Sequence, residues 1–183
     1  MSFVGDVFAS GVQGGARVEL CEKVNTQQAK DDPVAWLKSY SDSMGVGLAD
    51  YDLAYFRNTT IDTRKASRQW VYQTCTEFGY FQSPNTIEPM RSQLLNITFW
   101  NDFCRKIYGD SLSGVPDTAM INAKYGALNN QGKNVFFINS IEDPWRYAGI
   151  RNITDPEEHP TQKAMVIDCA DCSHCKDLKA PSD

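Results

Sequence analysis

The sequence lacks a long hydrophobic run and an excess of positive charge. A transmembrane helix needs about 20 consecutive apolar residues, and no run in this 183-residue chain approaches that length. The 23 aspartates and glutamates outnumber the 18 lysines and arginines, which leaves a formal net charge of −5. A mildly acidic chain has no electrostatic reason to bind nucleic acid or an anionic membrane surface. We therefore expect neither a nucleic-acid partner nor a membrane partner.

Histidines are scarce, and a common nucleophile motif is missing. The chain has only 2 histidines, His159 and His174, and no Gly-x-Ser-x-Gly sequence. A histidine general base can therefore only be one of these two residues. Without Gly-x-Ser-x-Gly, the chain lacks the usual motif of an α/β-hydrolase nucleophile. His159 lies in the polar loop DPEEHPTQ, so we expect it to be a solvated surface residue.

Cysteines and glycosylation sequons, in contrast, are frequent. Three Asn-x-Thr sequons begin at Asn58, Asn96 and Asn152. The 6 cysteines are Cys21, Cys75, Cys104, Cys169, Cys172 and Cys175. An even number of cysteines beside three sequons favours a secretory compartment, oxidised cysteines and glycosylation at these asparagines. The start, MSFVGDVFASG, has no basic region and is not a signal peptide, so we expect the natural protein to have a further N-terminal portion.

The C-terminal segment DCADCSHCKDL raises the question of a metal site. Its possible zinc ligands are Cys169, Cys172, His174 and Cys175. Structural zinc sites generally combine two ligand pairs that are separated along the chain, and no second pair exists here. We therefore expect disulfides rather than zinc, and neither a metal nor another cofactor. The sequence does not determine which cysteines pair.

The hydrophobic patterns predict helices in the first two-thirds of the chain and strands near its end. Helices are expected over residues 15–24, 33–44, 97–108 and 116–125. The aromatic stretch RQWVYQTCTEFGYFQ is ambiguous between a strand and a buried helix. Strands are expected over residues 134–139 and 163–168, and a polar loop over residues 46–66. The pattern indicates an α/β protein in which a helical subdomain precedes the last strands of a larger sheet.

Asp143 and His174 are the pair of residues with catalytic potential. Asp143 follows the first expected strand, within NVFFINSIEDPWR, and His174 follows the second. In α/β-hydrolases the triad runs in the order Ser, Asp, His, with each member on a loop after a strand. The buried carboxylate holds the imidazole in one tautomer and stabilises the imidazolium. The alternative is that Asp143 and the proline after it form only a structural turn.

The stretch YGDSLSG offers a different nucleophile, because it matches the serine block of GDSL-type esterases. Ser111 would be the nucleophile, and DCSH would supply the Asp-x-x-His motif near the C-terminus. In such esterases, however, the serine follows the first strand of the domain, whereas Ser111 follows an amphipathic helix. A helix end followed by a polar loop explains the stretch adequately, so the esterase is the minor alternative.

Three longer blocks resemble a known peptidase family. RQWVYQTCTEFGYFQ, NVFFINSIEDPWR and CSHCKDL occur in the order found in the proline-specific serine carboxypeptidase family. This family includes lysosomal Pro-X carboxypeptidase, dipeptidyl peptidase II and thymus-specific serine protease, and the blocks are most similar to the last of these. VELCEKV, DFCRKIYG and NAKYGAL fit the intervening pattern, so the resemblance extends over nearly the whole chain.

The resemblance implies the C-terminal part of an α/β-hydrolase fold together with helices of an inserted cap domain. Residues 1–66 would belong to the cap, and residues 67–183 to the cap–core junction and the C-terminal part of the hydrolase domain. Asp143 corresponds to the triad aspartate, His174 to the triad histidine, and Trp145 to an aromatic residue that lines the proline pocket. The family's serine lies upstream of anything in this chain, so the chain alone is expected to be inactive.

The expected function is that of a serine exopeptidase that acts next to proline, with a proline-containing peptide as its substrate. The resemblance implies a lysosomal, vacuolar or extracellular location. An alternative from a different class is a non-catalytic secreted glycoprotein module, or a decayed relative, and the missing serine favours it. The sequence determines neither the oligomeric state nor the choice between carboxypeptidase and dipeptidyl peptidase activity.

Overall fold

Segments that alternate along the chain form two compact units. The helical unit consists of Met1–Gly5 and Val46–Ala127. The sheet unit consists of Asp6–Gly45 and Leu128–Asp183. The predicted assignment of residues to a cap portion and a core portion stays a prediction. The computed structural model of the chain describes residues 2–84, 87–89 and 91–178.

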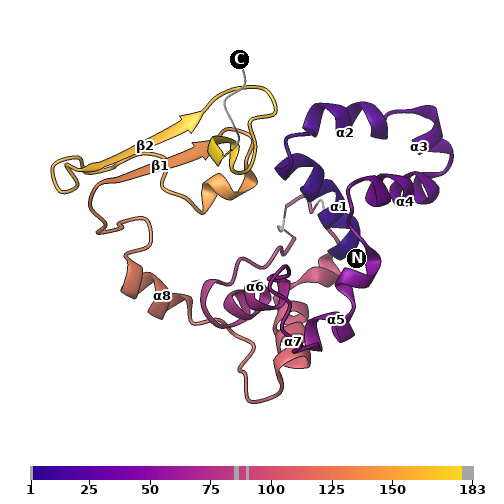
Figure 1. The fold of residues 1–183 in the computed structure, drawn as a ribbon, viewed down its shortest axis with the longest axis horizontal. Coiled ribbons are helices and arrows are strands. Elements are labelled where there is room, and N and C mark those ends of the chain that lie inside the picture. Colours follow the sequence, from indigo (N-terminus) through magenta and orange to yellow (C-terminus); the bar gives the residue numbers. More distant parts are fainter. Residues whose placement is uncertain (1, 85–86, 90, 179–183) are drawn as a thin grey trace. The chain divides into compact units, whose positions relative to one another are not determined.

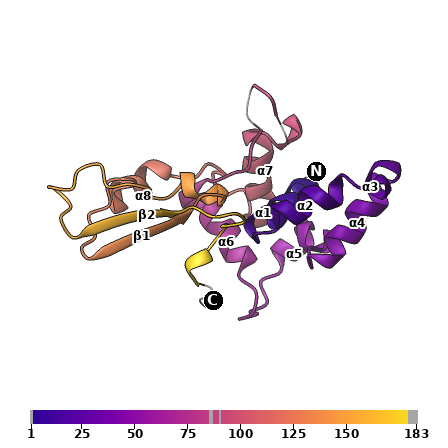
Figure 2. The ribbon, with the colours of Figure 1, turned by 90° about the horizontal axis from the view of Figure 1, so that it is seen from above.

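Two parallel strands give the sheet unit its name. β1 (Val135–Ser140) and β2 (Gln162–Ile167) pair in register over their whole length. Both strands lie within one residue of their predicted ranges, so that prediction is confirmed. Figures 1 and 2 show the two arrows side by side and pointing the same way. Because the carboxyl ends of parallel strands meet at one edge of a sheet, the loops after β1 and β2 begin close together.

The chain before the strands forms helices whose starts are marked by capping side chains. Thr26 and Asp32 cap α3 and α4, since their side-chain oxygens accept the N–H groups of Ala29 at 3.3 Å and Ala35 at 3.0 Å. The helices expected over residues 15–24 and 33–44 are confirmed as α2 and α4, whereas α3 is an addition. The bounds are α2 (Arg17–Val24), α3 (Gln27–Asp31) and α4 (Pro33–Ser43).

Helix α1 (Ser2–Gln13) is not expected from the sequence, because its glycines are poor helix formers. Its packing in the sheet unit explains why it forms. Val7 is fully buried, and a Cβ atom added at Gly11 would lie 2.6 Å from the hydroxyl oxygen of Tyr40. Tyr40 in turn stacks on Trp36, with ring centroids 5.3 Å apart. Close tertiary packing therefore overrides weak local propensity in α1.

All the regular secondary structure that the described residues of the helical unit form is helical. Asn96 caps helix α7 (Ile97–Tyr108), since its side chain accepts the N–H of Phe99, and Gly109, whose φ is 93°, follows the last residue of the helix. The helices expected over residues 97–108 and 116–125 are confirmed as α7 and α8 (Thr118–Tyr125), whereas α5 (Leu53–Arg57) occupies part of the expected loop. No helix in the described ranges has the length and apolar character that crossing a bilayer requires. The bounds are η1 (Leu48–Tyr51), α5 (Leu53–Arg57), α6 (Ser67–Gln73), η3 (Gln93–Leu95), α7 (Ile97–Tyr108) and α8 (Thr118–Tyr125).

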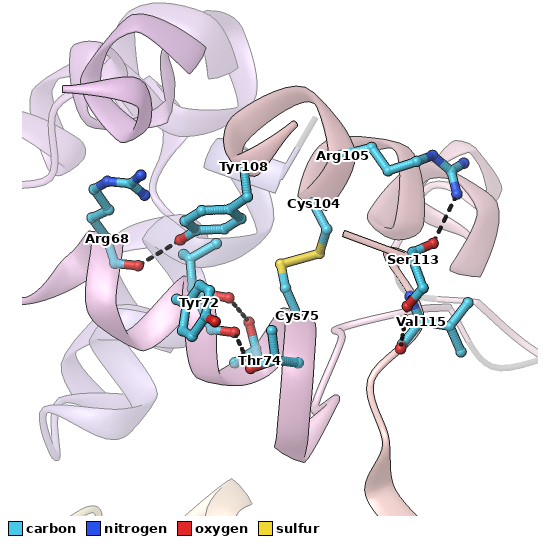
Figure 3. Close-up of a disulfide and its surroundings, with 11 residues drawn as sticks. Arg68, Tyr72, Thr74, Cys75, Cys104, Arg105, Tyr108, Ser113 and Val115 are labelled. Atoms are coloured by element: carbon cyan, nitrogen blue, oxygen red, sulfur yellow. Dashed lines mark hydrogen bonds between the residues drawn. A yellow bond between two sulfur atoms is a disulfide. The ribbon is translucent and has the colours of Figure 1, made fainter. Parts of the chain in front are cut away.

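A disulfide, shown in Figure 3, and a group of aromatic rings lie in the core of the helical unit. Cys75 and Cys104 are bonded with their Cα atoms 5.7 Å apart, and they join the short π-helix η2 (Thr74–Phe78) to α7. Both cysteines are buried. Phe103 on α7 meets Phe56 on α5 edge-on, with ring centroids 5.5 Å apart. Residues 68–78 of the ambiguous aromatic stretch thus form α6 and a π-helix rather than a strand.

The structure pairs four of the six cysteines. Besides the bond in the helical unit, Cys169 and Cys172 are bonded in the sheet unit, which agrees with the disulfides expected in the C-terminal segment. Cys21 and Cys175 are free thiols with exposed side chains. The expectation that the cysteines are oxidised is therefore wrong for these two residues.

Candidate functional site

The loop after β1 holds Asp143 in one orientation. Asp143 caps a short 3-10 helix, η4 (Pro144–Tyr147), which begins with a proline. Its backbone N–H donates to the carbonyl oxygen of Ser140 at 3.1 Å, and its Oδ1 accepts the backbone N–H of Trp145 at 2.9 Å. The rigid φ of the proline and the capping bond fix the carboxylate. Oδ2 is then the oxygen that can meet another side chain.

The loop after β2 brings His174 to that oxygen. His174 Nδ1 lies 2.8 Å from Asp143 Oδ2, so the contact predicted from the sequence is present. The backbone N–H of His174 donates to the carbonyl oxygen of Gln13 at 3.2 Å, and the hydroxyl of Ser173 donates to the carbonyl oxygen of Val12. These two bonds attach the loop to the end of α1. His174 is therefore held both through its ring nitrogen Nδ1 and through its backbone N–H.

The two partners differ in exposure, and the difference suits an acid–base pair. The side chain of Asp143 is 10% exposed, whereas that of His174 is 45% exposed. A carboxylate at Nδ1 favours the tautomer with the proton on Nδ1, which leaves the lone pair on Nε2. Within the described part of the chain, Nε2 has no protein hydrogen-bond partner. An imidazole in this state can accept a proton from a reacting hydroxyl group.

An ion pair between α2 and the Asp143 loop supports the site. Arg17 Nε and Nη2 donate to the two carboxylate oxygens of Glu142 at 2.7 and 2.8 Å. The backbone N–H of Glu142 donates to the carbonyl oxygen of Cys172 at 2.9 Å, and Val18 N–H donates to Asp171 Oδ1 at 3.3 Å. The hydrogen bond from Arg17 lowers the pKa of the Glu142 carboxyl. Sequence reasoning missed this pair because its members are 125 residues apart.

The other two residues that were considered for the site, Trp145 and Ser111, belong to different units. Trp145 is half-buried and belongs to η4, two residues after Asp143. Ser111 is exposed in the turn after α7, so it belongs to the helical unit, whereas Asp143 and His174 belong to the sheet unit. Among the described residues, no serine hydroxyl is hydrogen bonded to His174 Nε2.

His159 is not a solvated surface residue, so the prediction from its polar loop is wrong. Its side chain is 9% exposed, and its Nε2 lies 2.7 Å from Asn129 Oδ1. Nearby, the side-chain amide of Gln162 donates to the carbonyl oxygens of Asn130 and Gly132 at 2.6 and 2.7 Å. The loop before β2 therefore contacts the loop before β1. Local polarity did not reveal this contact, because the partner residues are about thirty positions away.

The three sequon asparagines are all exposed residues. Asn58 Oδ1 accepts the backbone N–H of Thr60 at 2.9 Å, and Asn96 caps α7. Asn152 lies in a bend between β1 and β2. Exposure is what attachment of an oligosaccharide requires. Glycosylation itself stays a prediction.

The chain is similar to proteases over most of its length. Residues 10–183 match the family described as "Serine carboxypeptidase S28". "Probable serine protease EDA2" of Arabidopsis thaliana is 33% identical over 135 residues, which are 74% of this chain and 26% of that protein. "Thymus-specific serine protease" of Mus musculus is 34% identical over 119 residues, which are 63% of this chain and 22% of that protein.

A third relative has a location in its name. "Probable extracellular serine carboxypeptidase" of Arthroderma benhamiae is 29% identical over 107 residues, which are 56% of this chain and 14% of that protein. The chain thus spans about a quarter of the length of these relatives, or less. No solved structure is significantly similar to the chain.

Proposed function

The chain belongs to the serine carboxypeptidase S28 family, and from this premise we propose that it supplies the acid and the base of a serine peptidase triad. The 2.8 Å contact between Asp143 Oδ2 and His174 Nδ1 carries the proposal. It joins the loops after two paired parallel strands, in the chain order that α/β-hydrolases use for their acid and base. Relatives that are named as serine proteases support the same class of reaction.

In the proposed reaction His174 acts first as general base and then as general acid. Its Nε2 takes the proton of the serine hydroxyl while the serine oxygen attacks the peptide carbonyl carbon, and it later gives this proton to the leaving amine. Asp143 stays ionised, accepts the Nδ1–H and stabilises the imidazolium. Because the N–H of Trp145 occupies Oδ1, the carboxylate cannot rotate away from His174 without losing that bond.

We place the nucleophilic serine outside these 183 residues. No Gly-x-Ser-x-Gly motif occurs in the sequence. Ser111 follows α7 rather than a strand, which argues against the GDSL-type esterase. An acid and a base without a nucleophile cannot form an acyl-enzyme, so the 183 residues alone are inactive in this proposal.

We propose that the substrate is a peptide with proline next to the scissile bond. Trp145 is half-buried beside Asp143, so it can offer a flat apolar surface near the reacting groups. A proline residue has no backbone N–H, so a binding site must recognise it mainly by shape and apolar contact. Trp145 is the residue that we assign to this contact.

We also propose that the protein follows the secretory pathway to a lysosomal, vacuolar or extracellular location. Two disulfides are present, and disulfides persist mainly in oxidising compartments. The exposed sequons and the relative named as extracellular support the same location.

Covalent labelling of the serine tests the proposed reaction. A fluorophosphonate probe should label the complete protein that contains these residues, and His174→Ala should slow labelling at least about 10⁴-fold. His159→Gln is the matched control, because it changes the other histidine of the chain, and it should label at the wild-type rate. An unlabelled complete protein would favour the non-catalytic glycoprotein module. Labelling of the 183-residue chain at Ser111 would establish the esterase instead.

A further inference from the structure

The helical unit has an open cavity at its surface, most of whose lining residues are exposed, and the proposed peptidase function does not use it. Its volume is about 640 Å³, within the range of roughly 300–1,000 Å³ that is typical of small-molecule sites. The end of α5, the loop between α5 and α6, helix α6 and the last residue of α7 line it. The Cys75–Cys104 disulfide joins the turn after α6 to α7, as Figure 3 shows. Two walls of the cavity are therefore covalently linked.

Tyrosine rings and cations line this cavity. Lys65 Nζ lies 5.3 Å from the ring centre of Tyr55, and the Arg68 guanidinium lies 4.6 Å from that of Tyr108. The hydroxyl of Tyr108 donates to the carbonyl oxygen of Arg68 at 2.6 Å, and Tyr72 meets the Tyr108 ring edge-on (Figure 3). These contacts fix the rings before any ligand arrives. Rigid aromatic surfaces of this kind provide contact area at a low entropic cost.

The remaining lining favours a neutral ligand with many polar groups. Gln69 and Gln73 line the cavity, and their side-chain amides have no hydrogen-bond partner among the described residues. Each amide provides both donors and an acceptor. Asp62 also lines the cavity, and Arg64 hydrogen bonds to it, so the lining is not uniformly cationic. Sugar rings have apolar faces that suit tyrosine rings, and hydroxyl groups that suit amides.

One lining residue can carry a sugar covalently. Asn58 lies on the cavity wall and begins the sequon Asn58-Thr59-Thr60. Its Oδ1 accepts the N–H of Thr60 at 2.9 Å, and its Nδ2, the atom that glycosylation modifies, has no protein partner in the described residues. We propose that an N-linked glycan is attached to Asn58 and that its first N-acetylglucosamine rings pack inside this cavity. The cavity is then a binding site for the protein's own glycan.

The attachment and the packing are chemically simple. One N–H bond of Asn58 Nδ2 is replaced by a bond to C1 of N-acetylglucosamine. The sugar comes from a lipid-linked pyrophosphate donor of the secretory pathway. The bond between its C1 and the pyrophosphate oxygen breaks, the lipid pyrophosphate is the leaving group, and the amide proton is released. A tethered sugar has a high effective concentration at the wall, so weak contacts with Tyr72 and the amides are enough to hold it. This inference rests on the proposed secretory route and is independent of the peptidase reaction.

Enzymatic removal of the glycans from the native protein tests the packing. The complete protein that contains these residues, expressed through a secretory pathway, should carry a glycan at Asn58, identified by mass spectrometry. Peptide N-glycosidase must reach the Asn–sugar bond, so it should release this glycan about tenfold more slowly than those at Asn96 and Asn152, which corresponds to ~1.4 kcal/mol of packing. Tyr72→Ala should abolish the difference. An unmodified Asn58, or equal release rates at the three sites, would overturn the proposal.

Thermal unfolding gives a second readout with matched variants. Thr60→Ala removes the sequon and should lower the Tm by roughly 2–4 °C, whereas Thr60→Ser keeps the sequon and should not. Thr98→Ala and Thr154→Ala remove the other two sequons and should change the Tm less. The effect of Thr60→Ala should vanish in a Tyr72→Ala background but persist in Tyr125→Ala, which changes an exposed tyrosine outside the cavity lining. Equal effects in both backgrounds would mean that the glycan does not use the cavity.

Discussion

The two units hold their central side chains by different kinds of contact. In the helical unit, the Cys75–Cys104 disulfide and stacked or edge-on aromatic rings do so, such as the Phe56–Phe103 pair. The sheet unit also has a disulfide, Cys169–Cys172, and a Trp36–Tyr40 ring stack. The side chains of its candidate site, however, are held by polar contacts, of which the Asp143–His174 bond is the central one. The ring packing depends mainly on buried area and the disulfide is covalent, whereas the polar contacts depend on the direction of each bond.

This difference separates stability from reactivity. Apolar packing tolerates small displacements, because the hydrophobic effect has no preferred direction. A hydrogen-bonded acid–base pair needs its atoms at one distance and angle, and it loses its role when a single atom changes. We therefore expect substitutions in the core of the helical unit to change the free energy of unfolding. Substitutions in the loops of the sheet unit should change turnover.

The largest effect is expected for Asp143→Asn. The asparagine Oδ1 can still accept the Trp145 N–H, so the fold should persist, but the amide no longer holds His174 in the productive tautomer. Turnover of a peptide substrate by the complete protein should fall about 10⁴-fold. Asp117→Asn is the control, because Asp117 caps α8 by the same kind of bond in the helical unit, and it should leave turnover unchanged. Near-normal turnover in Asp143→Asn would reduce this loop to a structural turn.

The next effect concerns the core of the helical unit. Replacing both Cys75 and Cys104 by serine should lower the free energy of unfolding by about 2–5 kcal/mol, because the bond joins residues 29 positions apart. Urea denaturation under non-reducing conditions measures this loss. Cys21→Ser, which changes a free thiol, should have little effect. Equal stability of the double variant and wild type would contradict our account of this core.

A smaller effect on selectivity is expected for Trp145→Ala. If the indole forms the wall against which a substrate proline packs, its loss should reduce the preference for proline over alanine roughly 10–200-fold. This range corresponds to the loss of ~1–3 kcal/mol of apolar contact. The measurement compares kcat/KM for two peptides that differ only at this residue. Trp145→Phe keeps an aromatic wall and should retain most of the preference. A uniform fall in kcat/KM for both peptides would show that Trp145 supports Asp143 but does not select proline.

The smallest effect is expected at the Arg17–Glu142 ion pair. Glu142→Gln removes a carboxyl whose pKa the hydrogen bond from Arg17 lowers in the folded chain. A lowered folded pKa contributes stability above the ordinary carboxyl pKa, and this contribution is lost as the pH falls through the lowered value. Wild type and Glu142→Gln should therefore differ slightly in their urea midpoints near neutral pH and converge in acid. Salt should reduce the difference, because the groups are solvent-accessible.

A second exposed pair provides the control for this comparison. Lys38→Gln breaks the 2.7 Å contact with Asp42 on the surface of α4. It should also cost little stability, but it should leave turnover unchanged. Glu142→Gln should lower turnover modestly, because its carboxylate joins the Asp143 loop to α2. If both variants had the same turnover, the ion pair would not support the site.

Local patterns were enough to predict much of the fold. Helix α7 was predictable because its apolar stripe and its terminal glycine, Gly109, act within a few residues of each other. The positions of β1 and β2 followed from short apolar runs, and the Asp143–His174 contact followed from their order along the chain. Helix α1 was not predictable, since it depends on the packing of Gly11 against Tyr40. The covering of His159 was missed for the same reason.

Local sequence patterns were sufficient to position α2, α4, α7, α8 and both strands, and to identify the acid and the histidine that follow the strands. Caps, glycine stops and hydrophobic periods act over short stretches, so they can be seen without the fold. In contrast, the pairing of Arg17 with Glu142 and the position of Asn58 and Tyr108 in the wall of one cavity arise from tertiary packing. These partners lie 125 and 50 residues apart, and contacts over such separations exist only after the chain has packed.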